Sequence, residues 1–401
     1  MKTLKSVMMG AAAATALLCA CESAPTATEL KSGLNPDDFK TTYTDDVKGE
    51  KAVELYTLTN GNGMEVSITN FGGRIVSIMV PDKNGDFQDV VLGFDTAEKY
   101  FPTNNASDFG AAIGRYANRL NQGCIVCDGD TIQLPQNNYG HCLHGGPTGW
   151  QYQVYDAELV DAQTLKLTME SPDGDNQFPG NVTAVVTYRL TDDNAIEIDY
   201  EATTDKETVI NMTNHSYFNL SGNPENTILD EILYVDADTY TPVDSTFMTT
   251  GEKASVEGTP MDFRTPKAIG QDIDKVEFDQ LLYARGDAAK VAADKGGYDH
   301  NWCLNTAGDA EKVAVRLTDP RSGITLEVYT NEPGIQVYTG NFQDGSAVGK
   351  KGITYTRQCA VCLETQKYPD SPNKQWAESN AYLKPGETYH SYCKFKFGVE
   401  K

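Results

Sequence analysis

Residues 53–69 carry the sequence V-E-L-Y-T-L-T-N-G-N-G-M-E-V-S-I-T, in which two alternating stretches flank a turn. In 53–59 and 64–69, apolar and polar side chains alternate, which is the pattern of strands with one buried face. Between them, N-G-N-G at 60–63 supplies the Asn-Gly pairs that favour a tight hairpin turn. The stretch therefore predicts an antiparallel β-hairpin.

The same signals recur along the chain. Strands are predicted at 74–80 and 90–94, on either side of the turn D-K-N-G-D at 82–86. Further alternating runs predict strands at 164–169, 182–190, 195–202, 313–317 and 324–329. Helical periodicity is weak throughout, and 279–289 is its best stretch. Many strands joined by turns rich in Gly, Asn and Asp are typical of an antiparallel sandwich or barrel, so the predicted fold class is all-β.

The first 20 residues predict an export signal. Lys2 and Lys5 precede a short run of apolar and small residues at 7–18, which is too short for a transmembrane span, and L-C-A-C follows at 18–21. Cysteine directly after L-x-A resembles a bacterial lipobox. We therefore expect residues 1–20 to be a lipoprotein signal peptide and Cys21 to carry the lipid. An ordinary cleaved signal with incidental cysteines is the alternative.

This N-terminus predicts an exported bacterial lipoprotein, anchored to a membrane on its periplasmic side or at the cell surface. Residues 21–46 are rich in Ser, Thr, Pro, Asp and Lys, with few large apolar side chains. Such a composition does not bury enough surface to offset the entropy of ordering, so a flexible tether is predicted. Residues 47–401 show no composition break and no repeat, which favours one large β domain.

The chain is acidic, with a formal charge of −24 at pH 7 and a pI of about 4.5. Removing residues 1–20 takes away Lys2 and Lys5 and no acid, which leaves −26. Such a protein repels nucleic acid and anionic head groups. We expect no nucleic-acid partner, and membrane contact only through the lipid anchor. Neutral small molecules fit this charge better than phosphorylated ones, and the sequence carries no signal for an oligomeric state.

Seven cysteines remain once Cys19 and Cys21 are set aside: Cys124, Cys127, Cys142, Cys303, Cys359, Cys362 and Cys393. C-x-x-C spacing occurs at 124–127 and 359–362, and two such pairs are the ligand number of a structural zinc site. Both pairs lie in runs that predict strands, where residues i and i+3 face opposite sides. Free buried thiols are therefore favoured over disulfides, and both over zinc.

Six segments concentrate side chains that bind sugars or move protons. They are G-R-Y-A-N-R at 114–119, H-C-L-H-G-G-P at 141–147, N-M-T-N-H-S-Y-F-N at 211–219, G-Y-D-H-N-W at 297–302, E-P-G-I-Q-V-Y-T-G-N-F at 332–342 and L-E-T-Q-K-Y-P-D at 363–370. Alone, each has a plain structural interpretation, such as surface salt bridges, a turn histidine or a buried hydrogen-bond network. The spacing of His141 and His144 suggests a metal, but no third ligand is near and the helical H-E-x-x-H pattern is absent, so no metal is predicted. Glu364 is an acid inside an apolar strand, which needs a partner or a raised pKa when it is buried.

In this order, the segments resemble the aldose 1-epimerase (galactose mutarotase) family. The resemblance rests on G-R-Y-A-N-R, L-H-G-G, T-N-H-S-Y-F-N, D-H-N, Q-x-Y-T-G-N-F and L-E-T-Q-x-x-P-D, and it covers roughly residues 47–400. It implies a large antiparallel β-supersandwich of the galactose mutarotase type. It also implies an isomerase that interconverts the α and β anomers of free aldohexoses such as galactose and glucose, without a cofactor.

The resemblance assigns roles to single residues. Glu364 matches the family's general base, His215 its general acid, and His144 a second catalytic histidine that binds and polarises the sugar. Substrate-binding positions are matched by Asn118, Arg119, Asp299 and Gln336. The predicted chemistry is removal of the C1 hydroxyl proton by Glu364 while His215 protonates the ring oxygen, followed by the reverse steps on the other carbonyl face.

Three alternatives remain at this stage. A glycoside hydrolase needs two carboxylates that flank a glycosidic bond, and Glu364 with Asp299 is such a pair by residue type. A hexose-phosphate epimerase relative needs extra cationic side chains in the cleft. A non-catalytic carbohydrate-binding lipoprotein keeps the aromatic residues and arginines but tolerates loss of Glu364.

Overall fold

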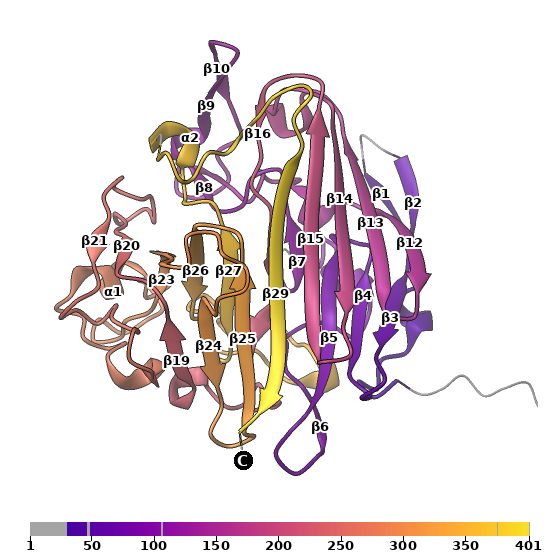
Figure 1. The fold of residues 1–401 in the computed structure, drawn as a ribbon, viewed down its shortest axis with the longest axis vertical. Helices are drawn as coiled ribbons and strands as arrows, with labels where there is room; N and C mark the ends of the chain where they lie inside the picture. The colour runs from indigo at the N-terminus through magenta and orange to yellow at the C-terminus, as the bar shows by residue number, and fades with distance from the viewer. Residues whose placement is uncertain (1–29, 46–48, 106, 375, 401) are drawn as a thin grey trace, which may run out of the picture.

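The computed structural model describes residues 30–45, 49–105, 107–374 and 376–400, and its regular secondary structure is almost entirely antiparallel strands (Figure 1). The largest sheet has nine strands, and its long strands alternate between buried and more exposed side chains. In spatial order they are β12 (Asp156–Asp161), β13 (Thr164–Ser171), β14 (Val182–Leu190), β15 (Ala195–Thr204), β29 (Tyr389–Val399), β25 (Ile324–Thr330), β24 (Val315–Thr318), β19 (Ile232–Val235) and β22 (Lys267–Ala268).

Two smaller sheets complete the frame. A six-stranded sheet has the order β18 (Tyr217–Phe218), β27 (Val361–Gln366), β26 (Gly334–Tyr338), β23 (Asp299–Cys303), β20 (Thr239–Thr241) and β21 (Ala254–Ser255). A four-stranded sheet has the order β3 (Leu55–Thr59), β4 (Glu65–Thr69), β5 (Arg74–Pro81) and β6 (Phe87–Asp89).

The remaining elements are short. Five two-stranded pairs are β1 (Thr41–Asp45) with β2 (Gly49–Val53), β7 (Ala111–Ile113) with β17 (Thr213–His215), β8 (Arg119–Leu120) with β11 (Cys142–Leu143), β9 (Cys124–Cys127) with β10 (Asp130–Gln133), and β16 (Thr208–Val209) with β28 (Tyr382–Leu383). The helices are α1 (Asp279–Tyr283) and α2 (Ser371–Lys374), and single 3₁₀ turns lie at Pro36–Phe39, Glu98–Tyr100, Asn121–Gly123, Trp150–Tyr152, Asp175–Gln177, Ile228–Asp230, Ile269–Gln271 and Lys350–Gly352.

The sheets lie in two layers. In Figure 1 the nine-stranded sheet forms the front layer, and the four- and six-stranded sheets lie behind it. One large hydrophobic cluster joins the layers: Val186 and Ile198 from the front layer cluster with Ile68, Val337 and Leu363 from the sheets behind. The predicted all-β class and the β-supersandwich are confirmed by this arrangement.

Most strand predictions are close to the observed bounds. The hairpin at 53–69 is β3 and β4, with Thr59 opposite Glu65 across the turn. The strand predicted at 182–190 is β14 residue for residue. Alternation and turn residues are local signals, so they identify these strands without knowledge of their partners.

Two local predictions are wrong. The strand predicted at 90–94 is instead β6 at Phe87–Asp89, because the hairpin partner follows the turn at 82–86 directly; Val91 forms only an isolated bridge with Phe218. The helix predicted at 279–289 is only α1, Asp279–Tyr283. It ends shortly before Gly286, whose φ of 100° lies outside the helical region.

The tether predicted at 21–46 is also wrong over its described part. Residues 30–45 fold against the domain: Phe39 is fully buried, Leu34 is buried beside it, and β1 pairs with β2. The buried carboxylate of Glu65 accepts hydrogen bonds from the backbone N–H groups of Lys31 and Ser32. The predicted signal peptide and Cys21 lie outside the described residues.

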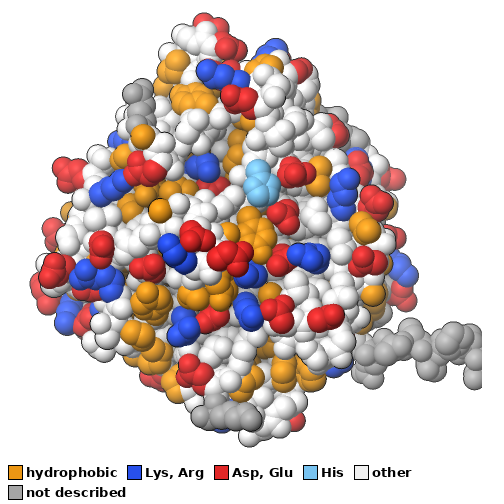
Figure 2. All heavy atoms as spheres, in the orientation of Figure 1, with side chains coloured by type: hydrophobic (Ala, Val, Ile, Leu, Met, Phe, Trp, Pro, Cys, Tyr) orange, Lys and Arg blue, Asp and Glu red, His pale blue; other side chains and the backbone are white. Residues whose placement is uncertain are grey.

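The outer face of the nine-stranded sheet is polar. Figure 2 shows acidic and basic side chains interspersed over this face, among smaller apolar areas. Lys394 and Lys396 of β29 and Glu327 of β25 are among the polar side chains that alternate with buried ones on these strands. Within the described ranges, no helix is both long and apolar enough to cross a membrane.

Candidate active site

Three strands of the six-stranded sheet place polar side chains in one row. Asn301 of β23 lies directly opposite Gln336 of β26, which lies directly opposite Glu364 of β27. Residues opposite one another in a sheet project from the same face, so these side chains share a side. Asp299 lies two residues before Asn301 on β23 and therefore faces the same side. Its Oδ1 accepts a hydrogen bond of 2.7 Å from Gln336 Nε2.

A second wall is formed by β7 and β17. His215 lies at the end of β17, opposite Ala111 of β7. Its Nε2 lies 3.5 Å from Glu364 Oε1, and both side chains are almost fully buried, with 6% and 2% of their surfaces exposed. The His215 ring stacks on Tyr217 at a centroid distance of 5.0 Å, which fixes its plane. An imidazole and a carboxylate, two groups able to exchange protons, therefore lie side by side.

The third wall joins the G-R-Y-A-N-R and L-H-G-G segments. A side chain at Gly145, where φ is 78°, would clash with the carbonyl oxygen of Gly114, so the two segments touch only because position 145 is glycine. Asn118 and His144 also have positive φ values, 62° and 51°. Strain of this kind in non-glycine residues is concentrated at functional sites.

This contact fixes the tautomer of His144. Its Nδ1 accepts a hydrogen bond of 3.1 Å from the backbone N–H of Asn118. Burial, with the nearby His215 and Arg119, lowers the pKa of His144 well below its ordinary value, so the ring is neutral. A neutral ring that accepts at Nδ1 carries its proton on Nε2. His144 is therefore a fixed hydrogen-bond donor.

All seven predicted catalytic and substrate-binding residues line one pocket of about 630 Å³. They are Asn118, Arg119, His144, His215, Asp299, Gln336 and Glu364. They come from five strands and two turns that are up to 246 residues apart in sequence (118 to 364). The volume is within the range of pockets that bind small molecules, roughly 300–1,000 Å³.

Burial shifts the pKa values of Glu364 and His215 away from those of ordinary glutamate and histidine side chains. It raises the pKa of Glu364 well above the usual glutamate value, and the carboxylates of Asp299 and Asp108 act in the same direction. It lowers the pKa of His215, an effect that the Asp108 carboxylate opposes. Glu364 Oε2 and His215 Nδ1 have no hydrogen-bond partner among the described residues. Buried polar atoms without partners inside a pocket are available to a ligand.

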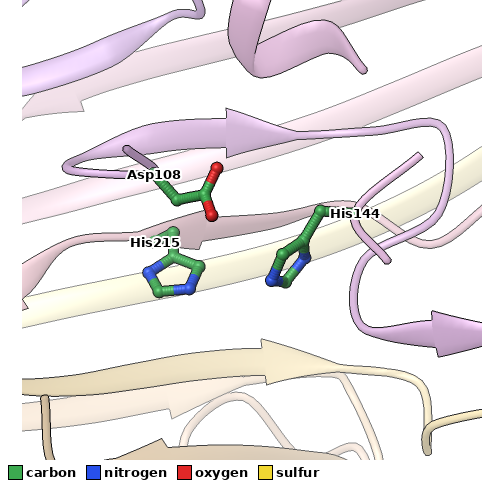
Figure 3. A group of neighbouring side chains, drawn as sticks. All are labelled: Asp108, His144 and His215. Atoms are coloured by element: carbon green, nitrogen blue, oxygen red, sulfur yellow. The ribbon is translucent and has the colours of Figure 1, made fainter. Parts of the chain in front are cut away.

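Asp108 is a site residue that the sequence analysis missed. Figure 3 shows its carboxylate facing the space between the rings of His215 and His144, and it lines the same pocket. Its Oδ1 is buried and has no hydrogen-bond partner in the described chain. The only sequence signal is an acid in S-D-F-G, directly before the buried run that forms β7.

Several polar residues of the same segments serve the fold instead. Arg115 points away from the pocket and donates to the backbone carbonyls of Pro179 and Gly180. His141 accepts the backbone N–H of Gln122 and does not line the pocket. Of the two arginines in G-R-Y-A-N-R, therefore, only Arg119 lines the site.

The asparagines of 211–219 also hold backbone segments together. Asn211 donates to the carbonyl of Ala117, and Asn214 donates to that of Gly110. These two bonds align the 211–214 segment with the residues just before and just after β7. In this segment, His215 and Tyr217 line the pocket.

The cysteines behave as predicted in the described chain. All seven are free thiols, and six of them are buried. Two groups of side chains have ligand atoms within 4.8 Å of one another: Asp108, His144 and His215, and His215, Cys362 and Glu364. Neither contains a C-x-x-C pair, so the structure gives no support to a Cys₄ zinc site.

The chain was compared with known proteins. Residues 54–396 match the family model described as aldose 1-epimerase. The chain is 38% identical to the galactose mutarotase of Mus musculus over 88% of this chain and 96% of that protein. It is 37% identical to the aldose 1-epimerase of Escherichia coli strain K12, over 86% and 95% respectively.

The chain belongs to the aldose 1-epimerase family. The resemblance found in the motifs is thereby confirmed, and the chain is an isomerase of this class. Solved structures agree. An aldose epimerase homologue from C. elegans superposes with a TM-score of 0.75 at 29% identity, covering 87% of this chain and all of that one. A galactose 1-epimerase from Lactobacillus acidophilus superposes with a TM-score of 0.73 at 27% identity, covering 90% and 99%.

Proposed function

We propose that this aldose 1-epimerase interconverts the α and β anomers of free galactose and glucose, with Glu364 as general base and His215 as general acid. The observation that carries the proposal is the distance of 3.5 Å between His215 Nε2 and Glu364 Oε1 inside a polar pocket. The two oxygens that exchange protons in a cyclic hemiacetal are bonded to the same carbon. A base and an acid this close can serve both oxygens at once.

The reaction runs in two balanced steps, each with two proton transfers. Glu364 takes the proton of the C1 hydroxyl while His215 gives a proton to the ring oxygen, the C1–O5 bond breaks, and the C1 carbonyl forms. The open sugar turns about C1–C2. Then protonated Glu364 returns its proton to the carbonyl oxygen as the C5 hydroxyl attacks C1 and gives its proton to His215. Each positioned acid or base contributes roughly 10²–10⁴-fold.

The other pocket residues hold the sugar in register with this pair. The Nε2–H of His144 donates toward the reacting oxygens and stabilises negative charge that develops there. Asp299 and Gln336 are hydrogen-bonded to each other, so they present a fixed acceptor and a fixed amide to sugar hydroxyls. Arg119 is oriented by a 3.1 Å hydrogen bond from its Nε to Asn138 Oδ1.

The charge of the pocket favours neutral sugars. Arg119 is the single Lys or Arg among its described lining residues, which include four acids: Asp108, Asp299, Asp344 and Glu364. A phosphoryl group would meet net negative charge there, so the hexose-phosphate alternative is disfavoured. A binding protein without catalysis has no need to bury an acid beside a histidine at the cost of desolvating both.

The pH dependence follows from the two shifts. The active form needs Glu364 ionised and His215 protonated. Burial moves the pKa of Glu364 upward and that of His215 downward, so the two limbs of the profile approach each other. The bell-shaped pH profile should be narrower than the roughly two pH units that separate the ordinary pKa values of glutamate and histidine, about 4.3 and 6.5. The kcat/KM against pH, fitted for both limbs, measures this.

The test is polarimetry. Pure α-D-glucose and α-D-galactose are dissolved with and without the soluble protein, residues 22–401, and optical rotation is followed to equilibrium. Faster relaxation to the same final rotation is expected. His215→Asn should remove most of the acceleration while thermal unfolding stays unchanged. An unchanged rate for both sugars with folded protein would overturn the proposal, and near wild-type activity in His215→Asn would refute its role.

We also propose that the protein reaches a membrane through lipid on Cys21. Support comes from the sequence alone: the charged and apolar start of the chain and the L-C-A-C segment at 18–21. One lipid-modified cysteine with two or more acyl chains holds a soluble body at a membrane surface. In a bacterial host, the full chain should sediment with membranes and incorporate labelled palmitate. Cys21→Ser should lose the label, and label retained in that variant would overturn the assignment.

A further inference from the structure

We propose that Arg74 is a positioning residue of the active site: its buried guanidinium holds the Asp108 segment in place and thereby fixes a negative charge beside His215 and Glu364. Arg74 is the first residue of β5 and does not line the pocket. The inference rests on the proposed function, because it concerns the charge that acts on the proposed acid and base.

Arg74 is a fully buried cation. Both of its hydrogen bonds in the described chain go to backbone carbonyls and not to a carboxylate. The faces of three aromatic rings surround the guanidinium: Tyr100 at 5.2 Å, Phe71 at 5.7 Å and Tyr152 at 5.9 Å. Aromatic faces attract a cation, but they replace only part of its lost hydration. A buried charge held in this way needs a further reason.

The start of β5 holds the backbone that directly follows Asp108. Arg74 Nη1 donates a hydrogen bond of 3.0 Å to the carbonyl of Phe109. The N–H of Ile75 donates 2.9 Å to the carbonyl of Gly110. One side-chain bond and one backbone bond therefore fasten two consecutive residues, and the Asp108 side chain projects from the end of this fastened segment.

The same segment contacts His215 on its other side. The N–H of Gly110 donates 3.0 Å to the carbonyl of His215. The ring of Phe109 meets that of Tyr217 edge-on at 4.8 Å, and Tyr217 stacks on His215. Figure 3 shows where this places the Asp108 carboxylate, which faces the space between the rings of His215 and His144. The segment thus lies between the guanidinium and the proposed acid.

Arg115, another buried arginine, shows what a purely structural role looks like. Its Nε donates to Ser171, Nη1 donates to the carbonyl of Pro179, and Nη2 donates to that of Gly180. All three nitrogens are engaged within the fold. Arg74 Nε, in contrast, is buried without a partner among the described residues. The hydrogen bonds of Arg74 therefore do not account for the whole of its guanidinium.

The charges of Arg74 and Asp108 oppose each other beside the acid–base pair. Burial lowers the pKa of His215, an effect that Asp108 opposes and Arg74 increases. Burial raises the pKa of Glu364, and Asp108 adds to that rise. The titratable and charged groups around Glu364 are His215, Asp299, Asp108, Arg119, Tyr217, Tyr338 and Cys362, and those around His215 also include His144 and Arg74.

Two opposite outcomes follow for the acidic limb of the pH profile, where activity falls as Glu364 takes up a proton. If Arg74 acted through its charge alone, a neutral substitution would raise the pKa of Glu364 and move this limb to higher pH. If Arg74 holds Asp108 in place, the same substitution releases the Asp108 carboxylate or lets it become neutral. The limb then moves to lower pH, because that carboxylate raises the pKa of Glu364. The sign of the shift separates the two roles.

The experiment measures kcat/KM for glucose against pH by polarimetry. Arg74→Met and Arg74→Gln remove a desolvated charge, which proteins often tolerate, and glutamine keeps an amide donor for one carbonyl. Arg74→Lys keeps the charge. Asp108→Asn is measured alone and together with Arg74→Met. Arg115→Gln is the matched control, since it also replaces a buried arginine with a neutral side chain. Thermal unfolding establishes which variants are folded.

We expect the acidic limb to move down by about 1 pH unit in each neutral Arg74 variant. The KM for glucose should stay within about twofold of wild type, because Arg74 does not line the pocket. Arg74→Lys should keep most of the wild-type position. Adding Asp108→Asn to Arg74→Met should move the limb no further, because the carboxylate already has no effect there. Arg115→Gln should lower the unfolding temperature and leave the limb in place.

A limb that stays in place or moves up in the neutral Arg74 variants would overturn the positioning role. So would an equal shift in Arg115→Gln, or a full further shift when Asp108→Asn is added. Failure of both neutral variants to fold would make Arg74 a residue of the fold and would also overturn it. All of these outcomes leave the epimerase activity standing. No acceleration of glucose or galactose by the wild type would instead overturn the proposed function itself.

Discussion

The nine-stranded sheet and the six-stranded sheet use the same backbone geometry in opposite ways. In β25 and β14, buried positions alternate with partly exposed ones along the whole strand, and most of the polar residues are at the partly exposed positions. In β23, β26 and β27, every position is buried, including Asp299, Gln336 and Glu364. The first sheet follows, at most of its positions, the rule that polar groups face water, and these three strands of the second sheet break it.

The cost of breaking that rule can be located atom by atom. In the six-stranded sheet, His300 Nε2, Asn301 Nδ2, Glu364 Oε2 and Gln366 Oε1 are buried without hydrogen-bond partners in the described chain. Each such group costs about 1–3 kcal/mol. The nine-stranded sheet contributes stability that offsets this, so one sheet supports the chemistry of the other. Substitutions in the six-stranded sheet should therefore lower activity more than stability, and substitutions in the nine-stranded sheet should lower stability more than activity.

The largest separation is expected for Glu364→Gln. Loss of the base should lower kcat/KM by roughly 10²–10⁴-fold. The melting temperature should stay the same or rise, because a buried carboxyl with a raised pKa is replaced by a neutral amide. Polarimetry and thermal unfolding measure the two effects.

The control is Glu327→Gln in β25, where the glutamate is ion-paired with Arg316. It should keep full activity. Comparable activity losses in both variants would remove the distinction between the two sheets.

The converse substitution is Leu326→Ala, next to Glu327 but facing the core. Leu326 is fully buried in the cluster between the layers. Truncation of a buried leucine leaves a cavity and should cost about 2–5 kcal/mol of unfolding free energy. The kcat/KM of the folded fraction should remain that of the wild type. Urea denaturation measures the cost, and a tenfold loss of kcat/KM at little loss of stability would contradict this division.

A smaller effect is expected for Asp108→Asn. The Asp108 carboxylate raises the pKa of both His215 and Glu364. Without it, protonated His215 is less favoured and ionised Glu364 is more favoured, so both limbs of the pH profile should move to lower pH. The profile of kcat/KM shows the shift directly. Asp95→Asn, which removes an exposed ion pair with Lys99, is the control and should leave both limbs in place.

The same comparison explains what the sequence could predict. Strands of the nine-stranded sheet can be predicted from the sequence because the alternation of buried and exposed residues is a local signal, as in β14. Their pairing is not local: β15 lies beside β29, almost 190 residues later (Ala202 opposite Tyr389). The composition of residues 21–46 predicts a tether, yet Phe39 and Leu34 pack in a hydrophobic cluster and Glu65 binds the backbone of Lys31 beside them.

The site could be predicted where a polar residue interrupts an apolar strand. Glu364 stands out for that reason, whereas His215 lies in a run dense in polar residues, and the motif resemblance supplies the roles of both. Asp108 does not interrupt an apolar strand. It precedes β7, and its position depends on the hydrogen bond from the Gly110 N–H to the His215 carbonyl, 105 residues away in sequence (110 to 215). The direction of Arg115 likewise depends on long-range carbonyl partners that the sequence does not show.

The smallest effect is expected from chelation of metal ions. This experiment tests whether the cluster of Asp108, His144 and His215 moves protons without a metal. The group of Asp108, His144 and His215 has ligand atoms close enough for a metal ion. However, His144 uses Nδ1 to accept the Asn118 amide and therefore carries its proton on Nε2, so neither nitrogen offers a free lone pair. In the second group, burial raises the pKa of Cys362 well above its ordinary value, which disfavours the thiolate that a metal requires. EDTA should therefore leave kcat/KM and the melting temperature unchanged, and loss of activity that zinc restores would contradict the metal-free mechanism.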